Sequence, residues 1–180
     1  MGNKAVIALF GMSGLLILFA TYASLLPDVL ESRAEVEIAK SKVEIKSFLN
    51  TASDWEEWLF EESLRNSEDW KVIPAGKASG EGSVLKWLSE RIGDGGLEIK
   101  KLDTNQIIFE RISDNNSFRD RCYLNLESTR NGTKIIMIDS LDVSTNFIAR
   151  YDAQDEQYLK MIDSSNVEVL KRLKSKIEAE

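Results

Sequence analysis

The sequence predicts an α+β domain that follows an N-terminal transmembrane helix. Three observations carry this prediction: an uncharged apolar stretch near the start of the 180-residue chain, a middle region of short strand patterns separated by turn signals, and a long amphipathic helix at the end. Hydrophobic residues make up 43% of the chain and charged residues 29%, which excludes a wholly disordered protein. We divide the chain into an anchor, residues 1–27, and one domain, residues 28–180.

The anchor prediction rests on residues 5–26, which are 22 residues without a charged side chain. A helix of this length rises about 33 Å, enough to cross a hydrocarbon core, and Pro27 ends it. A cleaved signal peptide is the rival interpretation, although it normally has a shorter apolar stretch and a more basic start than Lys4 alone; a buried core helix is the third. Lys4 before the span and acidic residues after it predict a single-pass membrane protein with a cytoplasmic N-terminus and an extracytoplasmic domain.

The domain is acidic and lacks the residues of the commonest catalytic sites. Residues 28–180 hold all 30 acidic side chains against 22 of the 23 basic ones, so nucleic-acid binding is not expected. The chain has no histidine and one cysteine, Cys122, which excludes Ser-His and Cys-His nucleophiles, an intramolecular disulfide and the usual zinc sites. We therefore expect no catalytic residue, no metal and no cofactor, and this balance favours a noncatalytic protein over an enzyme.

Local patterns predict each element of the domain in turn. Alternating apolar and polar residues predict a first strand at residues 33–39. A capping box formed by Ser41 and Glu44 begins a short helix that runs to about Asn50, and a second short helix covers residues 54–59.

Six further strands follow, separated by turns rich in glycine and asparagine. They are expected at residues 69–77, 83–91, 97–102, 106–112, 119–128 and 134–143, with turns at 80–82, 93–96, 114–117 and 130–133. The last of these turns contains Asn131-Gly132, a strong signal for a two-residue hairpin loop.

A long helix is expected at residues 152–179, with an apolar stripe along one side. The stripe consists of Leu159, Ile162, Val169, Leu170, Leu173 and Ile177. Because a sheet cannot leave its apolar face in water, this helix must cover it.

The order and spacing of these elements resemble the SRPBCC or START-like helix-grip superfamily, in its polyketide cyclase/dehydrase and lipid-transport branch. The matching segments are Glu35–Ala39, Trp55-x-x-Trp58, Gly80-x-Gly82 with Val84–Trp87, Gly132-Thr133, Arg150, and Leu170–Lys174 with Glu178. They cover residues 32–179, and a span that ends in Leu-Leu-Pro is similar to membrane-anchored bacterial members. The resemblance implies a helix-grip fold, in which a curved seven-stranded antiparallel sheet wraps around the long C-terminal helix and encloses an apolar cavity.

Strand alternation and this resemblance together select candidate residues for the cavity lining. Alternation places Leu85, Trp87, Leu97, Ile99 and Leu124 on the inner face. The full set of ligand-binding candidates is Trp55, Trp58, Leu85, Trp87, Leu97, Ile99, Leu124, Met137, Tyr158 and Ile162. Met137 is included on the resemblance alone, since the neighbouring isoleucines make the opposite face equally apolar. Whether these side chains line a hollow cavity or fill a core stays open, because the pattern is the same in both cases.

Few polar residues are candidates for chemistry. Glu110 and Arg111 are adjacent on an apolar strand; the preferred interpretation is a solvated strand end, and the alternative is that one of them faces inward and needs a partner. Asp139 and Asp142 are candidate general bases that lack a second group at a diagnostic spacing. Cys122 is interpreted as a small buried hydrophobic residue.

These observations predict a monomeric, membrane-tethered module that binds a lipid or another hydrophobic small molecule without catalysis. A cyclase or dehydratase acting on a hydrophobic substrate is one alternative, and converging inward charges in the cavity would favour it. A protein-interaction or chaperone-like module is the other, and a collapsed core with an exposed apolar patch would favour it.

Overall fold

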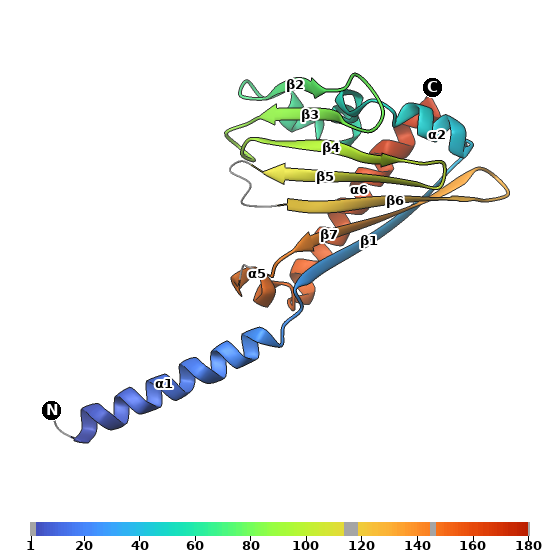
Figure 1. Ribbon diagram of the computed structural model, residues 1–180. Helices are drawn as coiled ribbons and strands as arrows, with labels where there is room; N and C mark the ends of the chain where they lie inside the picture. Colours follow the sequence, from blue (N-terminus) through green and yellow to red (C-terminus); the bar gives the residue numbers. More distant parts are fainter. Residues whose placement is uncertain (1–2, 114–118, 145–146, 180) are drawn as a thin grey trace.

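The domain is a seven-stranded antiparallel sheet whose inner face is covered by a long helix (Figure 1). The computed structural model describes residues 3–113, 119–144 and 147–179. The strands are β1 (Val29–Ile38), β2 (Lys71–Gly76), β3 (Ser83–Leu88), β4 (Gly95–Leu102), β5 (Gln106–Ser113), β6 (Arg119–Ser128) and β7 (Thr133–Asp142). Their order across the sheet is β1-β7-β6-β5-β4-β3-β2, so each strand from β2 to β7 pairs with its neighbour in sequence and β1 closes the far edge beside β7.

The described residues also form helical segments, some of which cover the inner face of this sheet. They are α1 (Asn3–Ser24), α2 (Lys42–Phe48), the 3-10 helix η1 (Ala52–Trp55), α3 (Glu56–Leu59), α4 (Glu62–Arg65), α5 (Phe147–Asp152) and α6 (Glu156–Ala179). Helix α6 lies behind the sheet in Figure 1, and its buried residues Val169, Leu170, Leu173 and Ile177 belong to the main core. The predicted α+β class, the seven strands and the covering helix are confirmed.

Four local predictions need correction. Strand β1 begins at Val29 rather than at residue 33, because β7 continues to pair with it as far as Asp142. The second short helix is divided into η1 and α3, and α4 was not predicted. The final helix does not begin at residue 152: α5 ends there, and the carboxylate of Asp155 accepts from the Gln157 backbone N–H at 2.8 Å, which caps the start of α6.

The loop between β6 and β7 has four residues instead of the predicted two, since the last strand pair is Ser128 with Thr133. Its glycine is required by close packing against β1: a Cβ atom on Gly132, whose φ is +154°, would lie 2.1 Å from the carbonyl oxygen of Ile38. The turn predicted at residues 114–117 lies outside the described residues.

The main core is built around tryptophans that precede β2. The rings of Trp55 and Trp58 lie 5.3 Å apart, and Trp55 meets Phe109 edge-on at 4.9 Å. The indole N–H of Trp55 donates to the carbonyl oxygen of Leu49 at 3.2 Å, so the ring is buried without losing its hydrogen bond. The predicted capping box of Ser41 and Glu44 is present and begins α2.

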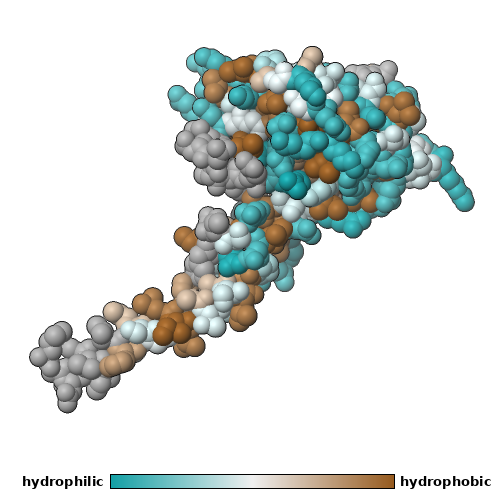
Figure 2. Space-filling model, viewed as in Figure 1, coloured by the Kyte–Doolittle hydropathy of each residue, from teal (hydrophilic) through white to brown (hydrophobic). Residues whose placement is uncertain are grey.

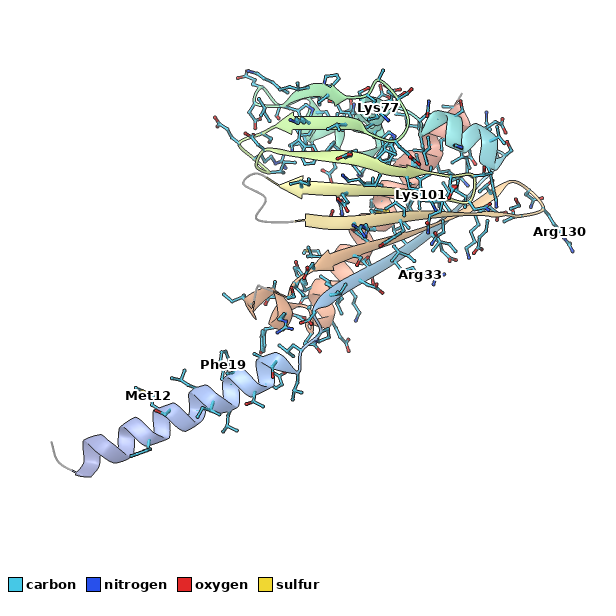
Figure 3. The ribbon with its side chains drawn as sticks, in the orientation of Figure 1. Met12, Phe19, Arg33, Lys77, Lys101 and Arg130 are labelled. Carbon is cyan, nitrogen blue, oxygen red and sulfur yellow. The ribbon has the colours of Figure 1, made fainter. Side chains whose placement is uncertain are left out.

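Helix α1 extends away from the domain (Figure 1), and many of its described side chains are apolar and exposed. Figure 3 shows Met12 and Phe19 pointing away from it, and Figure 2 shows the apolar character of its described surface. At its C-terminal end, Arg150 of α5 donates to the carbonyl oxygen of Ala23 at 3.2 Å and forms an ion pair with Asp28. Over the part of the chain that the structure describes, no helix is long and apolar enough to cross a membrane, which does not support the span predicted at residues 5–26.

Replacing Leu124 tests the packing of the main core. Its side chain is fully buried, so Leu124→Ala should lower the free energy of unfolding by about 2–5 kcal/mol, measured by urea denaturation. Val43, which is 70% exposed on α2, supplies the control: Val43→Ala should change stability by less than about 0.5 kcal/mol. Similar effects of the two substitutions would contradict a close-packed core at Leu124.

Candidate functional site

A cavity of about 700 Å³ lies between the sheet and α6. The sheet contributes inward-facing residues of β1, β3, β5, β6 and β7, and the opposite wall comes from α6 and the segment around α3 and α4. The apolar lining residues are Leu30, Leu59, Phe60, Leu64, Trp87, Ile92, Ile112, Leu141, Tyr158, Met161, Ile162 and Val169. The polar ones are Ser32, Glu61, Arg91, Arg111, Asp120, Asp139, Ser165, Asn166 and Arg172. This volume lies within the range of small-molecule sites.

Trp87 forms one side of the cavity and requires a glycine opposite it. Strand pairing sets Trp87 against Gly95, and a Cβ atom on that glycine would lie 2.4 Å from the indole ring. The indole N–H donates to the carbonyl oxygen of Gly93 at 3.1 Å, and Phe60 packs on the ring at 5.0 Å. Of the turn predicted at residues 93–96, only residues 93 and 94 precede β4, and Gly95 is the first residue of that strand, where it leaves room for the indole.

The turn from Ser89 to Asp94 is fixed by two carboxylates. Asp69 accepts hydrogen bonds from the Ser89 hydroxyl at 3.1 Å and from the backbone N–H groups of Glu90 at 2.8 Å and Arg91 at 3.3 Å. Asp94 accepts from the Ser89 backbone N–H at 3.0 Å. These bonds fix the backbone of Arg91, a residue that lines the cavity.

Arg172 of α6 ties the α3 wall to the helix. Its guanidinium donates to the carbonyl oxygens of Trp58 at 2.9 Å and Leu59 at 3.2 Å, which are orphan acceptors at the end of α3. The favourable placement of a cation at a helix C-terminus adds to these bonds.

An ion-pair cluster lies on the inner face of the sheet, at the cavity. The guanidinium Nε of Arg111 is 3.0 Å from each carboxylate oxygen of Asp120, and Nη2 is 2.7 Å from Asp120 Oδ2. The same Nη2 donates to Asp139 Oδ2. Asp120 is 5% exposed and Asp139 is 9% exposed, so two carboxylates are buried beside one guanidinium. Asp139 Oδ1 is buried and has no hydrogen-bond partner among the described residues.

Burial and charge act in opposite directions on these groups. Burial raises the pKa of Asp120 above its usual value, against the lowering effect of Arg111. For Arg111, burial lowers the pKa, but the charges of Asp139 and Asp120 outweigh it and raise the pKa overall. Arg111 is therefore a fixed cation beside the two carboxylates.

A second polar group lies beside the cluster, between β1 and α6. Asn166 Nδ2 donates to Ser32 Oγ at 3.0 Å, and Ser32 Oγ donates to Asp163 Oδ1 at 2.6 Å. Asn166, the residue that interrupts the apolar stripe of α6, is thus buried, and its Nδ2 is hydrogen-bonded to β1. Ser32 and Asn166 both line the cavity.

The ten predicted ligand-binding residues fall into two groups. Trp87, Tyr158 and Ile162 line the cavity. The other seven belong to the main core, are 0% or 1% exposed, and are not among the described residues that line the cavity. They are Trp55, Trp58, Leu85, Leu97, Ile99, Leu124 and Met137. The predicted inward orientation of the strand residues among them is confirmed.

The polar cluster is the feature that sequence reasoning missed. A solvated strand end was preferred for Glu110 and Arg111, but Arg111 faces inward and pairs with two carboxylates. The signal was present: Asp120 lies one alternation step before Cys122, and Asp139 lies one step after Met137, on faces already assigned as inward. Cys122 is a free, buried thiol, and burial raises its pKa well above the usual value, as expected for an inert residue.

The described residues do not contain a group of three or more histidine, cysteine, aspartate or glutamate side chains placed to hold a metal ion. Arg111 forms ion pairs with both buried carboxylates of the cavity wall.

No protein-family model matches the chain, and no curated protein is significantly similar to it in sequence. Solved structures are similar in fold. The di-domain ARO/CYC StfQ from the steffimycin biosynthetic pathway aligns with a TM-score of 0.58 and 12% identity, over 84% of this chain and 51% of StfQ. Ara h 8.0201 aligns with a TM-score of 0.56 and 12% identity, over 84% of this chain and 99% of that protein.

TTHA0849 from Thermus thermophilus is a third similar structure, with a TM-score of 0.56 and 18% identity over 83% of this chain and 97% of that protein. At these identities the likeness concerns the fold alone. It supports the antiparallel sheet and covering C-terminal helix described above for this chain, which spans about half of the two-domain StfQ and nearly all of the two other proteins.

The carboxylate of Asp69 should make stability depend on pH. Hydrogen bonds from Ser67, the backbone of Glu90, Ser89 and the backbone of Arg91 lower the pKa of Asp69 from 3.8 to about 2. A lowered pKa in the folded state means that the ionised form is stabilised, so this contribution is present above about pH 4 and is lost as the pH falls towards 2. Asp69→Asn should therefore lower the urea midpoint at pH 7, and its difference from wild type should shrink between pH 4 and pH 2.

The control is Asp152→Asn, which removes an exposed carboxylate far from this turn in the sequence. A difference between wild type and Asp69→Asn that stays constant down to pH 2 would contradict the role assigned to the ionised Asp69.

Proposed function

We propose that the domain binds an apolar small molecule in the cavity between the sheet and α6. The observation that carries this proposal is the cavity itself: about 700 Å³, lined mainly by apolar side chains, with a few convergent polar groups. A site of this composition suits a ligand that is largely hydrophobic and is oriented by a small number of polar contacts. Lipids and polycyclic molecules are the ligand classes that fit this description.

The cavity also bears on the alternatives. A protein-interaction module was expected to have a collapsed core, whereas this domain keeps an open volume beside a tightly packed core. A cyclase-type enzyme remains the second candidate, and the inward charges of Arg111, Asp120 and Asp139 favour it. In that role Asp120 would be the candidate group for proton exchange, because burial raises its pKa.

Two adjacent serines on α6 supply a matched test of ligand binding. Ser165 lines the cavity and Ser164 does not, while both side chains are accessible on the same helix. Ser165→Trp should fill part of the cavity and weaken binding of the neutral fluorescent probe N-phenyl-1-naphthylamine about tenfold or more, since the probe and the new indole compete for the same volume. Ser164→Trp should bind the probe as wild type does.

Fluorescence titration measures both affinities, and thermal unfolding establishes that both variants are folded. Failure of the wild-type protein to bind the probe, or equal binding by the two variants, would contradict ligand binding in this cavity.

The membrane tether is a separate proposal that rests on the sequence of residues 5–26 and on the exposed apolar side chains of α1, including Leu15 and Leu18. If α1 inserts in a membrane, the full-length protein should stay in the membrane fraction after an alkaline carbonate wash. Leu15→Lys with Leu18→Lys should release it, because each lysine costs about 2.5–3.5 kcal/mol at the centre of a span. Recovery of wild-type protein in the supernatant would contradict the tether and the extracytoplasmic location of the domain that depends on it.

A further inference from the structure

We propose that the ligand of the cavity carries a hydrogen-bond donor, a hydroxyl or a protonated amine, which binds the carboxylate of Asp139. This inference rests on the proposed function, since it assigns the polar end of the molecule that the cavity holds. It excludes fatty acids and other carboxylates as preferred ligands. The argument depends on the charge, the hydrogen bonds and the burial of three side chains.

The charge of the cluster favours donors over anions. Arg111 is the only cation in the cluster, and its guanidinium is engaged by both carboxylates, including three contacts of 3.0 Å or less with Asp120. Two carboxylates facing one guanidinium leave a net negative charge in a buried environment. An anionic ligand group placed here would be repelled, whereas a donor would be attracted.

The hydrogen bonds of the cluster leave one acceptor unused. Asp139 Oδ2 accepts from Arg111, but Asp139 Oδ1 has no partner among the described residues. A buried carboxylate oxygen without a hydrogen bond is costly, and a donor that satisfies it regains that cost. Asp139 lines the cavity, but its Oδ1 is occluded in this conformation, so a donor would bind after the carboxylate rotates about the broad terminal torsion of the aspartate.

The neighbouring polar groups do not offer the same acceptor. Ser32 Oγ already donates to Asp163 and accepts from Asn166. Asp120 accepts from the Arg111 guanidinium with both oxygens. Asp139 Oδ1 is therefore the buried side-chain oxygen of this wall that has no hydrogen-bond partner among the described residues.

Two other arginines line the cavity, and an anionic ligand group could bind to them instead of a donor binding to Asp139. Arg172 donates to two backbone carbonyls at the end of α3. Arg91 lies on the exposed turn at the rim. A carboxylate that bound the cavity would have to meet Arg91 in a solvated setting, where an ion pair contributes little.

Three ligands with the same twelve-carbon chain separate these outcomes: 1-dodecanol, dodecylamine and dodecanoate, each measured below its solubility limit at pH 7. Each competes with N-phenyl-1-naphthylamine bound to the full-length wild-type protein. We expect the affinity of the alcohol or of the amine, whichever binds more tightly, to be about tenfold or more higher than the affinity of dodecanoate. The tighter of the two donors identifies whether the natural ligand is neutral or cationic.

Asp139→Asn tests the residue itself. This substitution should weaken the binding of dodecylamine about tenfold and strengthen the binding of dodecanoate. The reason is that it removes one negative charge and leaves Arg111 with a single carboxylate partner. Asp142→Asn is the matched control: it removes an exposed carboxylate from the same strand, does not line the cavity, and should leave all three affinities unchanged.

The inference would be overturned if dodecanoate competed as well as both donors or better. If Arg91→Gln then lost the binding of dodecanoate, the carboxylate of that ligand would be assigned to the rim instead. The wild-type ligand series decides this even if Asp139→Asn fails to fold. Failure of the proposed function is a different result, because there the probe itself would not bind or would ignore Ser165→Trp.

Discussion

The structure depends on one constraint: the apolar inner face of a single open sheet has to be covered, and α6 is the element that covers it. Strand alternation places an apolar row on this face from β3 to β7, with the side chains of Leu85, Ile99, Phe109 and Met137 fully buried. The C-terminal half of α6 supplies matching residues, so sheet and helix form one continuous core. The cavity, which makes this protein a candidate for ligand binding, lies where α6 does not cover the sheet completely.

The cavity begins where the facing residues turn polar. Beyond Phe109 the inward positions become Arg111, Asp120 and Asp139 on the sheet, and Asn166 and Ser32 face them from α6 and β1. These groups cannot pack as closely as leucines, because each has hydrogen bonds to satisfy. A buried ion pair also adds little net stability compared with an apolar replacement, and the open volume lies beside this one.

Strand and helix patterns in the sequence predicted most of the fold, because the domain follows simple alternation and helical periodicity. Residues 119–128 matched their strand, and the turn with Gly80-Glu-Gly82 fell where β2 and β3 are joined. The turn predicted at residues 93–96 was placed too late, because Gly95 and Gly96 already belong to β4. The start of α6 was missed because periodicity alone does not reveal that Asp155 caps a new helix. The cavity was harder: a pattern of apolar residues is the same for a hollow and a filled interior, so Leu124 and Trp87 looked alike although only Trp87 borders the open volume. The charged cluster, in contrast, could have been found by extending the inward alternation to Asp120 and Asp139.

The two halves of α6 differ in how firmly they are held. Its C-terminal half is pinned by Val169, Leu170, Leu173 and Ile177, all between 0% and 6% exposed, and by the clamp of Arg172 on α3. Its N-terminal half carries Tyr158 and Ile162, which are only partly buried in a smaller cluster, and Met161, which is 60% exposed. The N-terminal half of α6 is thus covered by fewer buried apolar side chains than the C-terminal half, and it is tied to β1 by the hydrogen bonds of Asp163 and Asn166 with Ser32. Local opening of a helix is expected to begin where fewer apolar contacts are buried, which in α6 is the half beside the cavity.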